Sequence, residues 1–306
     1  MENKLKLNLS SDQLKAWIKQ ATVRVKQGHL PQYIPQLAQV DSEAFSICII
    51  SQDRSIKIEG DPTQPFPLMS IIKPFLLLYL LVELGTESVF QQVGVEPSEY
   101  PYNSLAQLQA DGGKPRNPMI NSGAITLADQ LSGKTAIDRC ENLRSWLNQW
   151  GNCQLILDET VYTSVAALPN PYNQALTQKL LQSGQIQDAK IALETYNLIC
   201  CLSATVVDLA KLGMMLVQPP ASIGQPSCKI VKALMMTCGL YQASAQFAVE
   251  VGLPTKSGVS GAVLSVIPNQ GAIACYSPPL DAQGNSIGGL GLIAKIAQAL
   301  NLSLFA

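Results

Sequence analysis

A serine and a lysine three residues apart, Ser70 and Lys73, precede an apolar run that extends from Pro74 to Val82. If this run is helical, Ser70 lies at its amino end and Lys73 lies one turn later over the same face. Serine becomes an effective nucleophile when a base takes its proton, and a lysine that burial keeps neutral can be that base. The pair indicates acyl-enzyme chemistry, although one such spacing also arises by chance and needs support elsewhere in the chain.

A second motif near the carboxyl end supplies that support. Lys256-Ser257-Gly258 leads into an apolar run at residues 262–267, which is typical of a buried strand. After a turn at 268–270, residues 271–277 are expected to form its hairpin partner. Serine acyl enzymes of the penicillin-binding type pair a Ser-x-x-Lys motif with Lys-Thr-Gly or Lys-Ser-Gly on a strand. Both halves of that arrangement are present in this sequence.

The composition is that of a globular enzyme and excludes several other classes of protein. The chain has 306 residues, of which 47% are hydrophobic and 14% are charged, and its net charge is -1. Because Lys and Arg are not clustered, we expect it to bind neither nucleic acid nor a membrane. The apolar stretch at 71–84 is too short for a membrane span and contains Lys73, Pro74 and Glu83, so it is expected to be a buried helix. Residues 1–28 lack the pattern of a signal peptide, which predicts a cytoplasmic protein.

The cysteines and the single histidine argue against metal or histidine chemistry. Eight cysteines are scattered through the chain without a Cys-x-x-Cys pair, so we expect them to be reduced and predict neither a metal nor another cofactor. His29 is the only histidine, and a Ser-His-Asp triad would have to use it. Because His29 lies where the first helix is expected to end, the base in a serine hydrolase must be a lysine or a tyrosine.

Strand patterns occur at both ends of the chain, and helical patterns occur between them. The first end combines a helix at 12–27 with strands at 44–51 and 55–59, which are expected to form a hairpin across Asp53-Arg54. The other end combines the 262–277 hairpin with a last helix at 286–302. Helices of the middle are predicted at 71–84, 136–150, 174–182, 206–217 and 230–238, with loops at 96–121 and 169–173.

This order predicts an α+β fold in which an antiparallel sheet is built from both chain ends, with flanking helices and a helical lobe. We expect a single catalytic domain, residues 1–306, with a sheet-containing lobe at 1–68 and 250–306 and a mainly helical lobe at 69–249. The cleft between the lobes would hold Ser70 and Lys256. A doubly wound parallel sheet is disfavoured because strand and helix patterns do not alternate.

Ordered motifs give the chain a resemblance to a known family. The sequence resembles the serine-dependent glutaminases of the beta-lactamase/transpeptidase-like fold over roughly residues 12–300. The matching segments are Tyr33-Ile34-Pro35-Gln36-Leu37-Ala38, Ser70-Ile71-Ile72-Lys73, Val93-Gly94-Val95-Glu96-Pro97-Ser98, Lys114-Pro115-Arg116-Asn117-Pro118-Met119-Ile120-Asn121, Tyr196 ahead of Cys200, Cys238-Gly239-Leu240-Tyr241, Gly252-Leu253-Pro254-Thr255-Lys256-Ser257-Gly258-Val259, Ser277-Pro278 and Gly284-Asn285-Ser286.

The resemblance implies hydrolysis of L-glutamine to L-glutamate and ammonia through an acyl-enzyme on Ser70. Lys73 and Tyr241 would activate the serine, and the backbone amides of Ser70 and Val259 would form an oxyanion hole. Lys256-Ser257-Gly258 would support this machinery. The residues that would bind the substrate are Tyr33, Ser70, Asn121, Asn173, Tyr196, Tyr241 and Val259. Resemblance to bacterial glutaminases also suggests a homodimer or a homotetramer.

The chain departs from the family pattern at a position that matters for substrate binding. Members usually carry Ser-Glu where this sequence has Ser164-Val165, and that glutamate neutralises the α-ammonium group of the substrate. Val165 cannot do so, and a desolvated ammonium group without a partner is costly. Glu159 is the candidate substitute by its proximity in sequence. The next segment, Tyr172-Asn173, replaces Arg-Asn behind one extra residue, which leaves the assignment of Asn173 open.

The sequence therefore leaves three functions open. The first is a glutaminase that retains the acyl-enzyme chemistry. The second is an amidohydrolase with the same mechanism on another amide, whose amino group is blocked or absent because Val165 replaces the glutamate. The third is a non-catalytic relative, against which the retention of Ser70, Lys73, Tyr241 and Lys256 argues.

Overall fold

Antiparallel strands from both ends of the chain form the central sheet of the protein. The computed structural model describes residues 9–305. The strands are β1 (Ser46–Ser51), β2 (Ile56–Glu59), β6 (Thr255–Ser257), β7 (Ala262–Ile267) and β8 (Gly271–Tyr276), in the order β2-β1-β8-β7-β6. Every neighbouring pair is antiparallel, and β1 pairs with β8 through partners such as Ile49 and Ile273. The predicted fold class is confirmed, because the two ends of the chain meet in the middle of one sheet.

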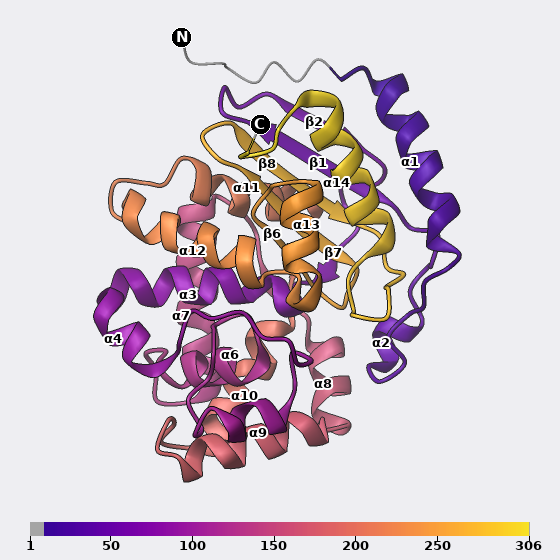
Figure 1. The fold of residues 1–306 in the computed structure, drawn as a ribbon. Coiled ribbons are helices and arrows are strands. Elements are labelled where there is room, and N and C mark those ends of the chain that lie inside the picture. Colours follow the sequence, from indigo (N-terminus) through magenta and orange to yellow (C-terminus); the bar gives the residue numbers. More distant parts are fainter. Residues whose placement is uncertain (1–8, 306) are drawn as a thin grey trace.

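Helices cover both faces of this sheet (Figure 1). Helices α1 (Ser11–Val25) and α14 (Ile287–Leu300) pack on one face, and α11 (Val206–Val217) packs on the other. Side chains alternate between the faces of a strand. In β1, Ile47 and Ile49 join the hydrophobic cluster of α1 and α14, whereas Cys48 and Ile50 join the larger cluster that contains α11. This explains why the four interior positions of β1 are all apolar instead of alternating with polar residues.

The middle of the chain is mainly helical, as the patterns predicted. Helix α3 (Ile72–Glu83) runs through the larger hydrophobic cluster, and its residues 72–81 are all buried. The helices around it are α4 (Gly85–Gln92), α5 (Leu105–Ala110), α6 (Asn121–Asp129), α7 (Ala136–Gly151), α8 (Glu159–Ala167), α9 (Pro171–Gln182), α10 (Ala189–Cys200) and α12 (Gln225–Cys238). Two short helices, α2 (Pro35–Ala38) and α13 (Ser244–Glu250), lie nearer the chain ends.

Several elements were missed by the sequence patterns. Helices α4, α6, α8 and α10 were not predicted, and the expected loop at 96–121 contains α5. Helix α9 begins at Pro171 within another expected loop, because Asn170 accepts hydrogen bonds from its first backbone N–H groups and proline suits the first helical position. A second sheet, in the order β3-β5-β4, joins β3 (Phe66–Pro67), β4 (Ile156–Leu157) and β5 (Leu202–Ala204). Its strands are two or three residues long, too short for a recognisable alternation.

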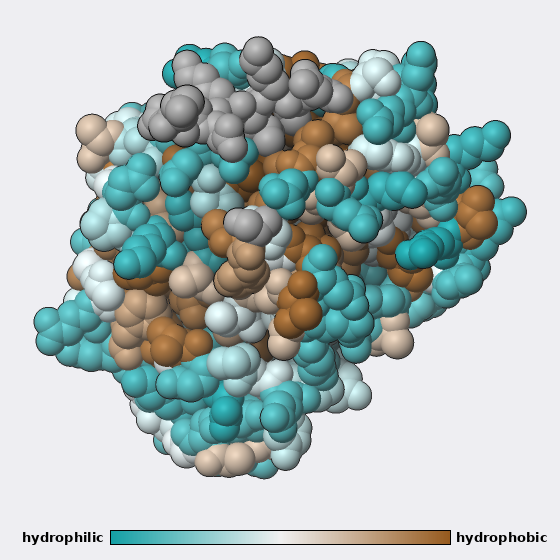
Figure 2. Space-filling view, turned by 45° about the horizontal axis from the view of Figure 1, so that its top comes forward, coloured by the Kyte–Doolittle hydropathy of each residue, from teal (hydrophilic) through white to brown (hydrophobic). Residues whose placement is uncertain are grey.

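The surface agrees with the moderate charge of the chain. On the face drawn in Figure 2, hydrophilic side chains cover most of the surface, and hydrophobic ones lie in smaller patches between them. Among residues 9–305, no helix combines the length and the apolar character that a membrane crossing requires.

The packing of α11 on the sheet gives a test of this arrangement. A Cβ atom on Gly213 of α11 would lie 2.7 Å from Ala272 Cβ and 2.8 Å from Leu264 Cδ1. We expect Gly213→Ala to lower the free energy of unfolding by about 1–3 kcal/mol, because the helix must move off the sheet. The control is Gly291→Ala in α14, where a Cβ meets nothing within 4 Å and better helix propensity adds up to about 1 kcal/mol. Equal stabilities of the two variants in urea unfolding would contradict the close approach of α11.

Candidate active site

Ser70 lies at the junction between the small sheet and the buried helix α3. Strand β3 leads into a 3-10 turn, Met69–Ile71, and α3 follows at Ile72. The turn is tied to the small sheet, because the Leu68 backbone N–H donates a hydrogen bond to Leu202 O (2.7 Å). Met69 has a φ of 48°, a left-handed conformation that is strained for a residue with a side chain. The predicted position of Ser70, at the amino end of the helix, is therefore what the structure has.

Lys73 lies wholly inside the protein, in the first turn of α3. Its Nζ atom donates to Asn121 Oδ1 (2.7 Å) and to the backbone oxygen of Met119 (3.1 Å). Burial lowers the pKa of Lys73 to about 7, and the nearby thiol of Cys200 opposes this shift. These two hydrogen bonds place the amine beside Asn121, one helical turn after Ser70, and the lowered pKa makes a neutral amine accessible near pH 7.

Asn121 connects three parts of the site. Besides accepting from Lys73, its Oδ1 accepts from Tyr196 Oη (3.1 Å), and its Nδ2 donates to Asn173 Oδ1 (2.8 Å). Lys73 and Tyr196 both donate to the same atom of the Asn121 side chain, so this atom is the amide oxygen, and the orientation of the amide is fixed. Burial raises the pKa of Tyr196 well above its usual value, so this phenol stays protonated. The network brings together residues from α3, α6, α9 and α10, and it places Asn173 in the site despite the extra residue before it.

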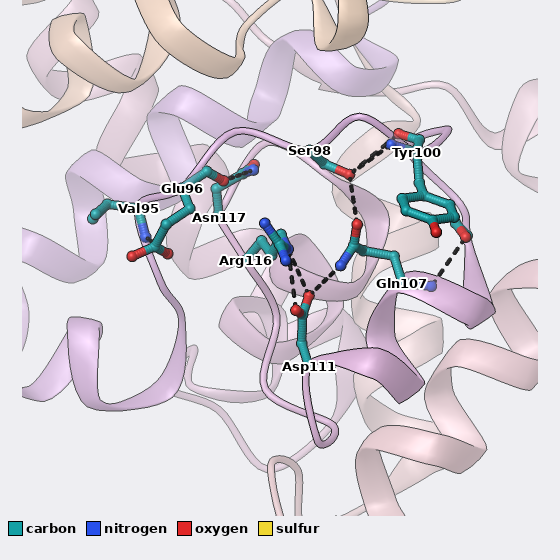
Figure 3. A network of polar contacts seen from close by, with 9 residues as sticks. Val95, Glu96, Ser98, Tyr100, Gln107, Asp111, Arg116 and Asn117 are labelled. Atoms are coloured by element: carbon teal, nitrogen blue, oxygen red, sulfur yellow. Dashed lines mark hydrogen bonds and ion pairs between the residues drawn. The ribbon is translucent and has the colours of Figure 1, made fainter.

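A polar network lies in the loop before Met119, and in it Asn117 contacts Glu96 (Figure 3). Asn117 Oδ1 accepts from the backbone N–H groups of Met119 (2.9 Å) and Ile120 (3.2 Å), while its Nδ2 donates to Glu96 O (2.7 Å).

In the same loop, Arg116 forms an ion pair with Asp111 (2.9 Å), and Gln107 Nε2 donates to Asp111 (2.7 Å). These contacts lie in the loop before Asn117, whose own hydrogen bonds position the segment that contains both acceptors of the Lys73 amine.

Tyr241 and Lys256 approach Ser70 from the other side. Lys256 Nζ donates to Gly239 O (2.9 Å), Ser257 O (2.7 Å) and Tyr241 Oη (3.2 Å). Burial and the charge of Lys73 lower the pKa of Lys256 well below its ordinary value. Burial raises the pKa of Tyr241, and a hydrogen bond with the Ser70 side chain opposes that rise. Like Met69, Tyr241 has a left-handed backbone, with a φ of 56°.

The Lys-Ser-Gly motif has a structural role at each position. Lys256 holds Tyr241, and Ser257 Oγ donates to Asn285 Oδ1 behind the strand. Gly258 faces the turn that carries Ser70, where a Cβ atom would lie 2.8 Å from the backbone oxygen of Leu68. A larger residue at position 258 would therefore push strand β6 away from Ser70.

A cavity of about 410 Å³ opens over Ser70. Six predicted residues line it, namely Tyr33, Ser70, Asn121, Asn173, Tyr196 and Val259. Tyr33 is half-exposed at the rim, whereas Lys73, Tyr241 and Lys256 are buried behind the wall. In the described residues, the backbone N–H groups of Ser70 and Val259 donate no hydrogen bond, so both remain free to meet a ligand in the cavity.

Sequence patterns missed other residues of the cavity wall. Tyr102 packs against Tyr241, with ring centroids 4.8 Å apart, and Asn197 and Cys200 follow Tyr196 on α10. Because α10 was not predicted, the spacing of Tyr196 and Cys200 by one helical turn could not be interpreted as a common face. Burial raises the pKa of Cys200 to about 11, so this thiol is protonated at neutral pH.

The wall contains no aspartate or glutamate among the described residues. Val165 of α8 does line the cavity, in the region where the family pattern has a glutamate. Glu159, the candidate substitute, lines a neighbouring cavity instead. The described residues also contain no group of three His, Cys, Asp or Glu side chains that could hold a metal ion.

Comparison with known proteins agrees with the resemblance of the sequence. The sequence model of the family described as Glutaminase matches residues 28–305. The chain belongs to the glutaminase family. A glutaminase from Synechocystis sp. is 44% identical over 292 residues, which cover 95% of this chain and 89% of that protein.

Two solved structures of this family add chemical information about relatives. A probable glutaminase from Bacillus subtilis, complexed with 6-diazo-5-oxo-L-norleucine, has a TM-score of 0.87 and 30% identity, covering 98% of this chain and 99% of that one. A covalent complex between a Bacillus subtilis glutaminase and 5-oxo-L-norleucine, formed by reaction with the diazo compound, has the same identity and TM-score. It covers 96% of this chain and 99% of that one.

The lowered pKa of Lys73 predicts a pH dependence of stability. The pKa of Lys73 is about 7 in the folded protein and about 10.4 for an unperturbed lysine. Between these two pH values the unfolded chain binds a proton at Lys73 that the folded protein lacks. The free energy of unfolding therefore rises as the pH rises. We expect the free energy of unfolding of the wild type to rise, relative to Lys73→Met, with a slope that grows from about half a proton at pH 7 to about one proton at pH 8.5.

Urea unfolding of both proteins at several pH values measures this slope. The difference between the two proteins cancels the contributions of titratable groups that do not interact with Lys73, whereas Lys256 and Cys200 interact with its charge and leave a smaller residual contribution. Parallel curves would contradict the lowered pKa of Lys73.

Proposed function

We propose that the chain hydrolyses the side-chain amide of L-glutamine to L-glutamate and ammonia through an acyl-enzyme on Ser70. The observation that carries the proposal is the position of Ser70 at the base of an open cavity, with the buried amine of Lys73 and the phenol of Tyr241 behind it. Membership in the glutaminase family and the covalent complex of a Bacillus subtilis relative with a glutamine analogue support it.

Lys73 is the proposed base. A neutral lysine amine has two N–H groups and one lone pair. Asn121 Oδ1 and Met119 O accept the two N–H groups, so the lone pair remains free to take the proton of Ser70. The raised pKa of Tyr241 keeps its phenol protonated, so it does not act as a phenolate base. Instead, its hydroxyl relays a proton between Ser70 and Lys256, giving up one proton as it takes another.

The steps follow from these positions. Ser70 Oγ forms a bond to the amide carbon, its proton moves to the base, and the negative carbonyl oxygen accepts from the N–H groups of Ser70 and Val259. The proton then moves to the amide nitrogen, the C–N bond breaks and ammonia leaves. Water attacks the resulting ester with the same base, which releases glutamate and restores Ser70.

A second candidate function is the same reaction on a glutamine whose α-nitrogen carries no charge. The specific observation that favours it is the wall of the cavity, where Val165 stands and no carboxylate is found among the described residues. A desolvated ammonium group without a carboxylate is strongly disfavoured, whereas an acylated nitrogen is uncharged. A non-catalytic role has no such support, because Tyr241 lies between Ser70 and Lys256 and the buried amine of Lys73 is 6.0 Å from the centre of the Tyr241 ring.

The same proposal extends to the setting of the enzyme. All eight cysteines are buried and free, which is compatible with a reducing compartment and supports a cytoplasmic location. By the resemblance to bacterial glutaminases, we propose that the chain acts as a homodimer or a homotetramer.

Substitution of the nucleophile tests the reaction. We expect Ser70→Ala to abolish ammonia release from glutamine and covalent labelling by 6-diazo-5-oxo-L-norleucine, detected by mass spectrometry. In the wild type, the labelling rate should rise with pH through about 7, because Lys73 becomes neutral there. Ser46→Ala is the matched control, since Ser46 is also a buried serine but lies in β1. Retained labelling in Ser70→Ala would exclude the proposed nucleophile.

Substitution of Val165 distinguishes the two candidate substrates. Val165→Glu adds a carboxylate to the cavity wall, so it should raise kcat/KM for free glutamine at least about tenfold relative to N-acetylglutamine. Val165→Gln has the same size without the charge and should not produce this change. If Val165→Glu and Val165→Gln behave alike, the α-ammonium group does not bind beside position 165.

A further inference from the structure

Tyr102, in the loop between α4 and α5, contacts several parts of the site around Ser70. Its backbone oxygen accepts a hydrogen bond from the backbone N–H of Asn121 (2.8 Å). Its ring packs on that of Tyr241, with the centroids 4.8 Å apart. Its side chain also lines the cavity over Ser70. Tyr102 therefore lies between the segment that holds Lys73 and the phenol beside the nucleophile.

The phenol of Tyr102 lies beside that of Tyr33, at the rim of the cavity. Partial burial raises the pKa of Tyr33, and the charge and the hydrogen bonding of Tyr102 raise it further. Both side chains line the cavity, and neither is fully buried, so a ligand can reach them. Two neighbouring phenols have two O–H groups, of which at most one donates to the other. The pair therefore keeps at least one O–H group for a ligand.

The cavity offers an anion neutral donors in place of a cation. Its wall contains no Lys, Arg or His among residues 9–305. The phenols that line it are those of Tyr33, Tyr102 and Tyr196. Tyr196 already donates to Asn121 Oδ1 (3.1 Å). Tyr33 and Tyr102 are therefore the lining phenols with a donor to spare.

The proposed substrate carries one group that matches such donors. Its reacting carbonyl oxygen meets the backbone N–H groups of Ser70 and Val259, and its α-nitrogen donates hydrogen bonds whether it is charged or acylated. The α-carboxylate can only accept, and hydrogen bonds to a charged acceptor are the stronger ones. In an extended glutamine it lies at the end remote from the amide that reacts. Tyr33 is 51% exposed at the rim, so the phenol pair reaches toward that end.

We propose that Tyr102 is a further substrate-binding residue, whose phenol joins that of Tyr33 in donating hydrogen bonds to the α-carboxylate of the substrate. This inference rests on the proposed amide hydrolysis at Ser70, and it names a residue that selects substrates with a free carboxylate. Tyr102→Phe separates this role from packing, because it removes the donor and keeps the ring on Tyr241.

Turnover of matched acids and esters tests the proposal. The substrates are the better of free glutamine and N-acetylglutamine, and the α-methyl ester of the same compound. We expect Tyr102→Phe to lower kcat/KM for the acid about tenfold and to change kcat/KM for the ester far less. The loss should lie mainly in KM, because the carboxylate is bound equally before and during the reaction.

Tyr100→Phe is the matched control. Tyr100 lies in the same loop, where its backbone belongs to the polar network of Figure 3, and it is not part of the cavity wall. This variant should keep the preference of the wild type for the acid. Comparable losses for acid and ester in Tyr102→Phe would mean that the hydroxyl acts on the fold or on Tyr241, and would overturn the proposal. An unchanged preference for the acid in Tyr102→Phe would overturn it as well.

Binding provides a second measurement that does not need turnover. The acid and the ester are titrated calorimetrically into Ser70→Ala and into the double variant Ser70→Ala, Tyr102→Phe. Acid binding that is about tenfold weaker in the double variant, with equal ester binding, supports the carboxylate site. Equal acid binding to both proteins overturns it. Such a failure with ammonia release still dependent on Ser70 would refute this inference alone, whereas ammonia release independent of Ser70 would refute the proposed function.

Discussion

Lys73 carries a positive charge in water, yet none of its side chain reaches solvent in the folded protein. Burial lowers its pKa to about 7, and the rest of the site is arranged around the neutral amine that results. Asn121 and Met119 accept its N–H groups, and Asn117 holds Met119 in place. The apolar sequence of α3 is what excludes water around the amine. The long hydrophobic helix and the lowered pKa of Lys73 are therefore linked, because the helix creates the apolar surroundings of the amine.

Two segments reach Ser70 with strained or close-packed backbones. Met69 and Tyr241, on opposite sides of the serine, both have left-handed conformations. Such conformations cost about 1–3 kcal/mol each and persist where the surrounding structure fixes them. Here the fixation comes from the β3–β5 pairing before Met69 and from Lys256 beside Tyr241. Stability elsewhere in the fold is thus used to hold the serine and the tyrosine within reach of each other.

The sheet and the position of Ser70 at the start of a helix were predictable from sequence because they depend on local patterns. Ala262–Ile267 and Val206–Val217 have the predicted bounds, and Ser70 precedes a helix. The network around Asn121 was not predictable from local patterns, since its partners Lys73 and Asn173 are 48 and 52 residues away in sequence. Asn121 and Tyr196 were identified only through the family resemblance, because the helices that position them, α6 and α10, gave no pattern that was recognised.

The wall of the cavity over Ser70 illustrates the same limit. The replacement of the family glutamate by Val165 was visible in the sequence. The lack of any other carboxylate in that wall, among the described residues, became visible only in the structure.

The pairing of β1 with β8 affects when a working enzyme first exists during synthesis. Ile49 of β1 is paired with Ile273 of β8 in the sheet. Because these residues are far apart in sequence, β1 emerges from the ribosome long before its partner. Lys256 and Tyr241 belong to the same late part of the chain, and without them Ser70 has neither its phenol nor its strand neighbour. The surroundings of Ser70 are consequently incomplete until the last strands are made, and a prematurely terminated chain never assembles them.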